Sequence, residues 1–287
     1  MKCAGIAVGV ATALTVTACE GSKDSDQPIV VASTDVWGNI AAAIAGPDAT
    51  VRSLIADPTA DPHSHETSAV ESAEISDADL VVYNGGGYDE FAERAVTSMD
   101  KRTVDAFALR VDESDENEHV WYDMRTVGVV ADRIASQLGE LNPSKSTAYA
   151  ERAAAFKNQL TTITAITAEA ATAHPRTPVL QTEPLAHYLL VAAGAEDLTP
   201  HEFQEAVEQE TDPAPTAVAT TRDLLTGNRV RALVYNVQTQ DKITKDLRAT
   251  AQSAGITVVE VTETLPDGLD YLQWQTTTAQ ALAAALR

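Results

Sequence analysis

One long stretch without glycine or proline constrains this chain more than any other feature. After Asn142-Pro143, no residue between 144 and 174 is glycine or proline. Apolar side chains recur there every three or four residues, which places them on one stripe of a helix: Tyr149, Ala153, Phe156, Leu160, Ile163, Ile166 and Ala170. A helix of about 30 residues would be roughly 45 Å long. The pattern therefore predicts a stiff rod at 142–174 that divides the chain into two parts.

Short apolar runs alternate with helical patterns on both sides of this rod. The strand-like runs lie at 29–32, 50–55, 80–83 and 102–107 before it, and at 178–180, 231–235 and 257–261 after it. The run Leu80-Val81-Val82-Tyr83 is apolar throughout, which is typical of a strand covered on both faces. Such alternation predicts parallel sheets flanked by helices. We therefore expect an α/β protein with two lobes, at 28–141 and 175–287, joined by one long rigid helix.

The N-terminus has the pattern of a targeting segment. Lys2 precedes an uncharged, apolar run from Ala4 to Ala18, which at roughly 15 residues is too short to span a bilayer. We interpret 1–18 as a signal peptide. Val16-Thr17-Ala18-Cys19 resembles a bacterial lipobox, and the alternative is an ordinary signal peptide with an incidental cysteine. We expect a lipid on Cys19 to anchor the protein to the outer face of the cell membrane through a polar tether at 19–27.

Charge and cysteine content exclude several classes of protein. The chain has 287 residues with 42 Asp and Glu against 20 Lys and Arg, a formal net charge of -22. A nucleic-acid-binding protein needs a basic face to neutralise phosphates, so we expect no nucleic acid as a partner. The two cysteines, Cys3 and Cys19, both lie at the extreme N-terminus. This excludes a disulfide scaffold and a zinc site built from cysteines.

Polar residues that follow the predicted strands are the candidates for chemistry. In open parallel sheets, ligands bind beyond the carboxyl ends of the strands. Four such positions carry residues that bind metals: His63, His119, Glu183 and Glu263. Imidazole and carboxylate together suit Mn, Fe, Zn or Ni, and the absence of thiolate disfavours Cu(I). Each residue alone also has a structural interpretation, such as a capping histidine or a solvent-facing acid, so the prediction depends on the joint pattern.

Other residues remain possible at such a site. His65 lies two residues after His63, and His187 lies four residues after Glu183, so both are rival ligands. The run from Asp112 to Glu118 is interpreted as a solvated acidic loop rather than a metal-binding one.

Taken together, these features resemble those of the zinc- and manganese-binding lipoproteins of bacterial ABC importers, the cluster A-I solute-binding proteins. Five stretches in order carry the resemblance: Asp61 to Glu66, Ala78 to Gly85, Glu118 to Asp123, Leu233 to Thr239 and Val261 to Pro266. The resemblance covers about 28–287. It implies two α/β lobes, a long connecting helix and one metal ion buried between the lobes. It carries the four ligands onto His63, His119, Glu183 and Glu263, and a carboxylate at position 183 is frequent in manganese-binding members.

The expected function is therefore capture of one divalent metal ion as cargo, Mn²⁺ in preference to Zn²⁺, by a monomeric extracytoplasmic protein that delivers it to an ABC permease. We expect no enzymatic activity. A metal-dependent hydrolase is the first alternative, but the chain contains no His-Glu-x-x-His pair and no Gly-x-Ser-x-Gly elbow. A surface adhesin with a structural metal site is the second, and it does not exclude metal capture.

Overall fold

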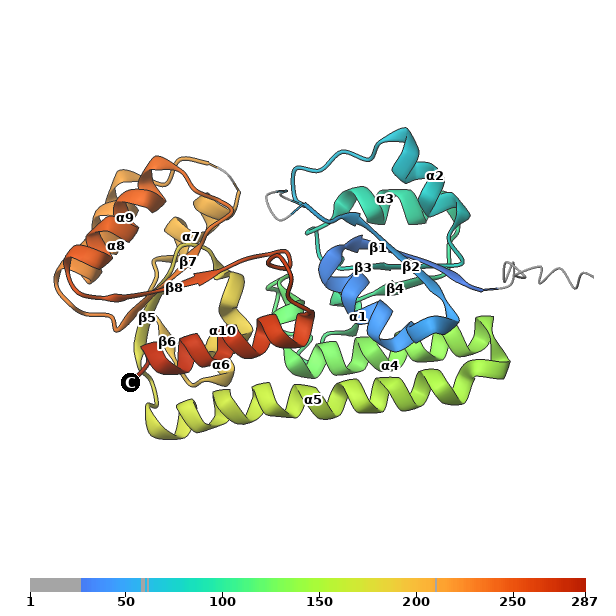
Figure 1. Cartoon of the computed structure of the whole chain (residues 1–287). Coiled ribbons are helices and arrows are strands. Elements are labelled where there is room, and N and C mark those ends of the chain that lie inside the picture. The colour runs from blue at the N-terminus through green and yellow to red at the C-terminus, as the bar shows by residue number, and fades with distance from the viewer. Residues whose placement is uncertain (1–26, 58–59, 61, 210) are drawn as a thin grey trace, which may run out of the picture.

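The computed structural model describes residues 27–57, 60, 62–209 and 211–287. The predicted signal peptide at 1–18, Cys19 and all but the last residue of the predicted tether lie outside these described residues. Two α/β lobes stand side by side on a long helix that runs beneath both of them (Figure 1). This confirms the predicted fold class.

The N-terminal lobe contains a four-stranded parallel sheet with strand order β2-β1-β3-β4. Its strands are β1 (Ile29–Thr34), β2 (Thr50–Ile55), β3 (Leu80–Tyr83) and β4 (Thr103–Asp105). Its helices are α1 (Asp35–Ala45), α2 (Ala69–Asp77), α3 (Glu90–Met99) and α4 (Met124–Leu141). Short 3-10 turns lie at η1 (Gly46–Asp48), η2 (Phe107–Leu109) and η3 (Val120–Tyr122).

The C-terminal lobe repeats this arrangement, with a parallel sheet ordered β6-β5-β7-β8. Its strands are β5 (Pro178–Gln181), β6 (Glu196–Asp197), β7 (Ala232–Asn236) and β8 (Thr257–Val261). Its helices are α6 (His187–Ala192), α7 (His201–Glu208), α8 (Pro215–Thr226), α9 (Lys242–Ser253) and α10 (Tyr271–Ala285), with a 3-10 turn η5 at Pro184–Ala186.

Both sheets bury apolar side chains on both faces, because successive residues of a strand point to opposite sides. In β1, Val30 and Ala32 belong to the core shared with α1, α4 and α5, whereas Val31 belongs to the core under α2 and α3. In β7, Val234 faces the shared core and Leu233 faces the core under α7, α8 and α9. The continuous apolar runs in the sequence are therefore explained by helices on both faces.

The two lobes share one core along the connecting helix. The predicted rod appears as a 3-10 turn η4 (Pro143–Lys145) followed by α5 (Ser146–Ala173). Its buried stripe runs from Tyr149 to Ala170, with Thr167 buried and Ile166 only half-buried. Residues of both lobes pack against this stripe in a single core cluster. We infer that a continuous core on a stiff rod permits only limited movement of the lobes.

Three elements were not predicted from the sequence. They are α2, the two-residue strand β6 and α7. The start of α2 is a capping box, in which Ser68 and Glu71 each accept a hydrogen bond from the other's backbone N–H. The strand predicted at 102–107 is shorter, because β4 ends at Asp105 and η2 follows. No helix in the described part of the chain is long and apolar enough to cross a membrane.

Candidate metal centre

The polar residues that follow the strands gather where the strand order of each sheet reverses. In the N-terminal sheet this point lies between β1 and β3, and in the C-terminal sheet between β5 and β7. Asn84 follows β3, Glu183 lies two residues beyond β5, Asn236 ends β7 and Glu263 lies two residues beyond β8. A crevice outside the carboxyl ends of strands at such a point is the usual ligand site of open α/β sheets.

The N-terminal half of the centre consists of two histidines and a glutamate. The ligand atoms of His63, Glu118 and His119 all lie within 4.8 Å of one another. The ring centroids of His63 and His119 are 6.5 Å apart. His63 is exposed, Glu118 is half-buried and His119 is only 2% exposed. The predicted acidic loop at Asp112 to Glu118 is therefore mostly exposed, but its last residue faces the two histidines.

The C-terminal half consists of two glutamates held by one amide. Glu183 and Glu263 are both buried, and the Asn236 side-chain Nδ2 donates a hydrogen bond to each: to Glu183 Oε2 and, at 2.8 Å, to Glu263 Oε1. Gln238 further holds this half, since its Oε1 accepts the backbone N–H of Glu263 and its Nε2 donates to Thr264 Oγ1 at 2.9 Å. Two carboxylates are thus fixed side by side within a buried site.

Tyr88 lies between the two halves. Its ring centroid is 4.8 Å from that of His63 and 6.1 Å from that of His119, and its hydroxyl donates to Glu263 Oε2 at 3.3 Å. Two further hydrogen bonds cross from lobe to lobe nearby: Tyr122 to the Thr262 carbonyl at 2.8 Å and Tyr271 to the Trp121 carbonyl at 2.5 Å. The structure thus brings the four predicted ligands to one interlobe region, with Glu183 and Glu263 outside the tighter group of His63, Glu118 and His119.

A buried polar cluster positions the N-terminal half. Asn84 Nδ2 donates to the Glu118 carbonyl at 2.8 Å, and Trp37 donates to Asn84 Oδ1 at 3.3 Å. Asp89 is fully buried and accepts the backbone N–H groups of Asn84 at 2.7 Å and Gly85 at 2.8 Å. Gly85 has φ of 75°, and a Cβ there would lie 2.4 Å from Asp105 Oδ1, so glycine is required for this turn.

The protonation of His119 suits metal binding. Burial, followed by the charges of His63 and His187, holds the pKa of His119 well below its ordinary value of 6.5. The imidazole is therefore neutral at neutral pH, and neutral imidazole is the form that binds metal. Its Nδ1 lies 3.2 Å from Asn117 Oδ1. If Nδ1 carries the proton, this contact leaves Nε2 as the nitrogen free to bind an ion.

A third acid from the C-terminal lobe faces the same place. Glu208, the last residue of α7, has its Oε1 3.7 Å from His119 Nε2. Burial, the charge of Glu118 and a side-chain hydrogen bond with it, and the charges of Glu183 and Glu263 raise the pKa of Glu208 to about 9. Glu118, Glu183, Glu208 and Glu263 thus lie close enough to repel one another when ionised. A divalent ion would reduce this repulsion.

The two rival histidines are directed to other partners. His65 Nε2 lies 2.9 Å from Glu71 Oε1, and its ring packs edge-on against Phe91. His187 Nε2 lies 2.8 Å from Asp115 Oδ2, and the neighbouring Tyr188 donates to the Asn117 carbonyl at 2.6 Å. The pair at His187 therefore fastens the acidic loop that carries Glu118 and His119 to α6.

Sequence reasoning missed four residues of this centre: Tyr88, Glu118, Glu208 and Asn236. One signal was available for Asn236. The triplet Val-Tyr-Asn occurs at 82–84 and again at 234–236, at the end of a central strand in each lobe. In the structure both asparagines use their side-chain amides to hold residues of the candidate centre.

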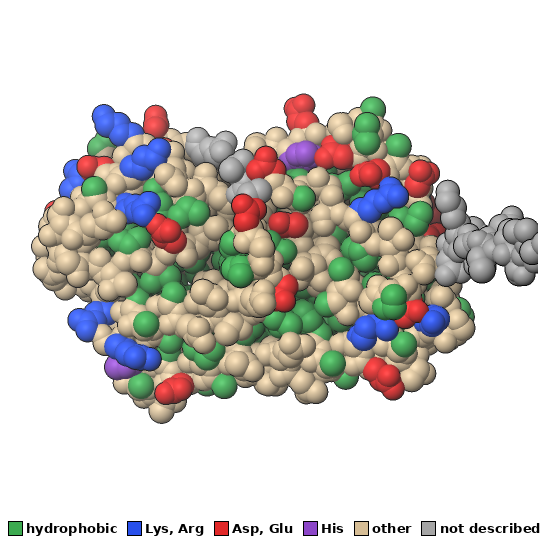
Figure 2. Space-filling view, viewed as in Figure 1, with side chains coloured by type: hydrophobic (Ala, Val, Ile, Leu, Met, Phe, Trp, Pro, Cys, Tyr) green, Lys and Arg blue, Asp and Glu red, His purple; other side chains and the backbone are tan. Residues whose placement is uncertain are grey.

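The surface agrees with a site for cations. In the middle of the face shown in Figure 2, between the lobes, the charged side chains are acidic, and most Lys and Arg lie nearer the outer ends. A cleft bordered by one sign of charge raises the local concentration of counter-ions. The chain's charge of -22 has the same sign.

Comparisons with known proteins identify metal-binding relatives. The chain is 26% identical over 167 residues to the zinc-binding protein TroA of Treponema pallidum, which covers 54% of this chain and 53% of TroA. It is 28% identical over 148 residues to the manganese-binding lipoprotein MntA of Halalkalibacterium halodurans, which covers 48% of each chain. The matches thus span about half the length of these curated relatives. Their names describe TroA as zinc-binding and MntA as a manganese-binding lipoprotein.

Solved structures show the same fold. The TroA structure superposes with a TM-score of 0.76 at 19% identity, covering 91% of this chain and 99% of TroA. The laminin-binding protein Lmb of Streptococcus agalactiae also gives 0.76, at 24% identity and with 91% and 100% covered.

One family description spans nearly all of the described chain. The family of the periplasmic zinc-uptake complex component A matches residues 30–285, which include both lobes, the connecting helix and all six acidic and histidine side chains of the centre. The chain therefore belongs to the family of the periplasmic zinc-uptake complex component A, ZnuA.

Proposed function

We propose that this protein captures a divalent transition-metal ion between its lobes and delivers it to an ABC permease. The observation that carries the proposal is the meeting of His63 and His119 from one lobe with Glu183 and Glu263 from the other. Two neutral imidazoles and two carboxylates leave a divalent ion electrically neutral, which suits a buried site. In this proposal Mn²⁺ is the favoured cargo and Zn²⁺ the second choice.

The rest of the chain has a role in the same proposal. Residues 1–18 are a signal peptide and 19–27 a tether whose lipidated Cys19 anchors the protein to the outer face of the membrane. The lobes at 28–141 and 175–287 close around the ion, and the helix at 142–174 limits the closure because both lobes pack on it. The protein acts as a monomer, and the permease is its partner. The relatives named as lipoproteins and metal-binding proteins support this proposal.

The capture itself has a direct test. Full-length protein in mild detergent is stripped with a chelator, dialysed, and titrated with Mn²⁺ and Zn²⁺ in competition, with bound metal counted by elemental analysis. We expect one equivalent of either ion, and no comparable binding of Mg²⁺ or Ca²⁺, because two imidazole ligands favour transition metals. Protein that retains no stoichiometric Mn²⁺ or Zn²⁺ would contradict the proposal.

A further inference from the structure

Glu208 reaches the centre because of how α7 packs. Phe203 and Val207, one turn apart on this helix, are buried in the core under the C-terminal sheet. This packing fixes the helix and turns the next residue, Glu208, toward the other lobe. The Glu208 side chain is 20% exposed, and its Oε1 lies 3.7 Å from Nε2 of His119, whose side chain is 3% exposed. Glu208 is thus a contact between lobes at a proposed ligand.

In the metal-free fold Glu208 shares a side-chain hydrogen bond with Glu118, but its contact with His119 is neither a hydrogen bond nor an ion pair. A distance of 3.7 Å is too long for a hydrogen bond, and a neutral His119 offers no ion pair. Glu208 Oε1 is buried and makes no hydrogen bond to any described residue. A buried carboxyl in this position costs free energy unless something else satisfies it.

The distance does suit two ligands of one ion. Two donor atoms bound at about 2.1 Å to the same ion lie about 3.0 Å apart at right angles and about 4.2 Å apart when opposite each other. The separation of 3.7 Å between Glu208 Oε1 and His119 Nε2 falls within this range. An ion bound to both would satisfy the buried carboxylate and the buried imidazole together.

We propose that Glu208 is a further metal-binding residue, and that it makes the centre prefer Mn²⁺ to Zn²⁺. This inference rests on the proposed function. His63, His119, Glu183 and Glu263 already supply the four ligands of a tetrahedral zinc ion. A further carboxylate adds an oxygen donor that a six-coordinate Mn²⁺ uses and a four-coordinate Zn²⁺ does not. Selectivity would then come from the number and type of donors.

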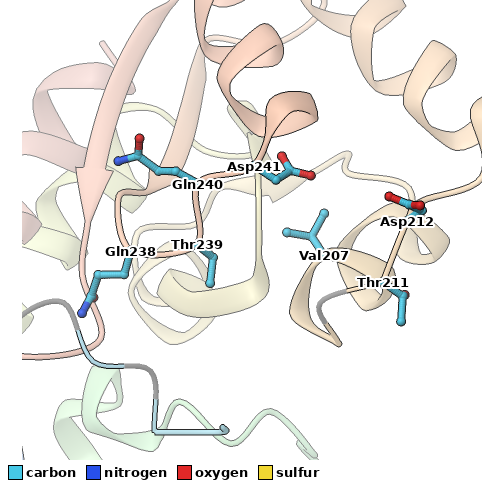
Figure 3. A pocket seen from close by; sticks show the side chains of 7 residues that line it. All are labelled: Val207, Thr211, Asp212, Gln238, Thr239, Gln240 and Asp241. Carbon is cyan, nitrogen blue, oxygen red and sulfur yellow. The ribbon is translucent and has the colours of Figure 1, made fainter.

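The end of α7 also borders a hollow in the C-terminal lobe. A hollow of about 360 Å³ lies beside the end of the helix (Figure 3). Val207, Thr211 and Asp212 line one side of it, and the loop Gln238 to Asp241 lines the other. The residues that line it all belong to the C-terminal lobe, and neither Glu208 nor His119 is among them.

The test compares Glu208→Gln with Glu205→Gln in full-length, metal-stripped protein. Glu205 lies on the same helix, with a side chain 55% exposed, and pairs with His201 away from the centre. Dissociation constants for Mn²⁺ and Zn²⁺ are measured in competition at one pH and ionic strength. We expect Glu208→Gln to weaken Mn²⁺ binding by at least about 10- to 100-fold, the loss seen even for residues that only support a metal ligand. Zn²⁺ binding should weaken by less than about threefold because four ligands remain. Glu205→Gln should change neither.

The outcomes separate the two proposals. If Glu208→Gln leaves the ratio of Mn²⁺ to Zn²⁺ affinity unchanged, Glu208 does not determine metal preference. This holds whether both affinities weaken equally or neither changes, and metal capture itself still stands. Wild-type protein that binds neither ion overturns the proposed function itself. Thermal unfolding of the metal-free variants checks their folding, and Glu208→Asp, which keeps the carboxylate, should recover part of the Mn²⁺ affinity.

Discussion

Replacing His119 by alanine should strongly weaken metal binding by this protein. His119 is a buried, neutral imidazole that lies within ligand distance of His63 and Glu118 and faces Glu208 from the other lobe. The free energy of metal binding at structural zinc sites with four ligands is about 10–16 kcal/mol. One ligand accounts for roughly a quarter of this, so its loss should weaken affinity about 10²- to 10³-fold. The measurement is the competition titration of metal-stripped, full-length protein.

His201→Ala is the matched control for this variant. His201 is exposed at the start of α7, and its Nδ1 lies 3.6 Å from Glu205 Oε2. We expect it to keep wild-type affinity for both ions. Full metal binding by His119→Ala would show that the ion does not use this imidazole and would contradict the proposed centre.

The second large effect is on stability and concerns Asp89, which holds the turn after β3. Burial raises the pKa of Asp89 from 3.8 to about 6. The folded state therefore favours the protonated, neutral form of Asp89. The stability that this protonation provides is fully present below about pH 3.8, the pKa in the unfolded chain, and is lost as the pH rises through about 6. A rise of this size corresponds to roughly 3 kcal/mol.

Asp89→Asn measures this contribution, because the amide stays neutral at every pH. We expect the variant to be less stable than wild type at pH 4, since an amide cannot accept both backbone N–H groups. Between pH 4 and pH 8 the difference in unfolding free energy between variant and wild type should shift by about 2.4 kcal/mol in favour of the variant. Denaturant unfolding in the presence of chelator provides the measurement and keeps metal out of it. If the difference in unfolding free energy stays constant with pH, or moves in favour of wild type, the pKa of Asp89 is not raised in the folded protein.

The fold could be predicted from the sequence because its signals are local. The long interval without glycine or proline predicts α5, and uninterrupted apolar runs such as the one at 80–83 predict strands covered on both faces. The strand β6 has only two residues, too few to form a pattern. Helix α7 has eight residues, of which only Phe203 and Val207 are buried apolar ones, so its apolar stripe is too short to stand out.

The candidate site was predictable only in part. Residues that follow strands can be placed from topology alone, because parallel strands end at the same edge of a sheet. His63, His119, Glu183 and Glu263 were predicted in this way. Glu208 follows a short helix, and it reaches the centre only because α7 packs on the C-terminal sheet and turns its last residue toward the other lobe. Glu118 is indistinguishable in sequence from its exposed acidic neighbours. Contacts of this kind depend on tertiary packing, which no local pattern encodes.

The most direct test of the central claim is a crystal structure of the Mn²⁺-loaded protein, with the ion located by anomalous scattering at the manganese edge. We expect one strong peak between the lobes, with His63, His119, Glu183 and Glu263 each about 2.0–2.3 Å from it. Capture between the lobes would be contradicted by an ion bound only to His63, Glu118 and His119. In that case Glu183 and Glu263 would still be held by Asn236, away from the ion. So would a peak at any other place on the chain.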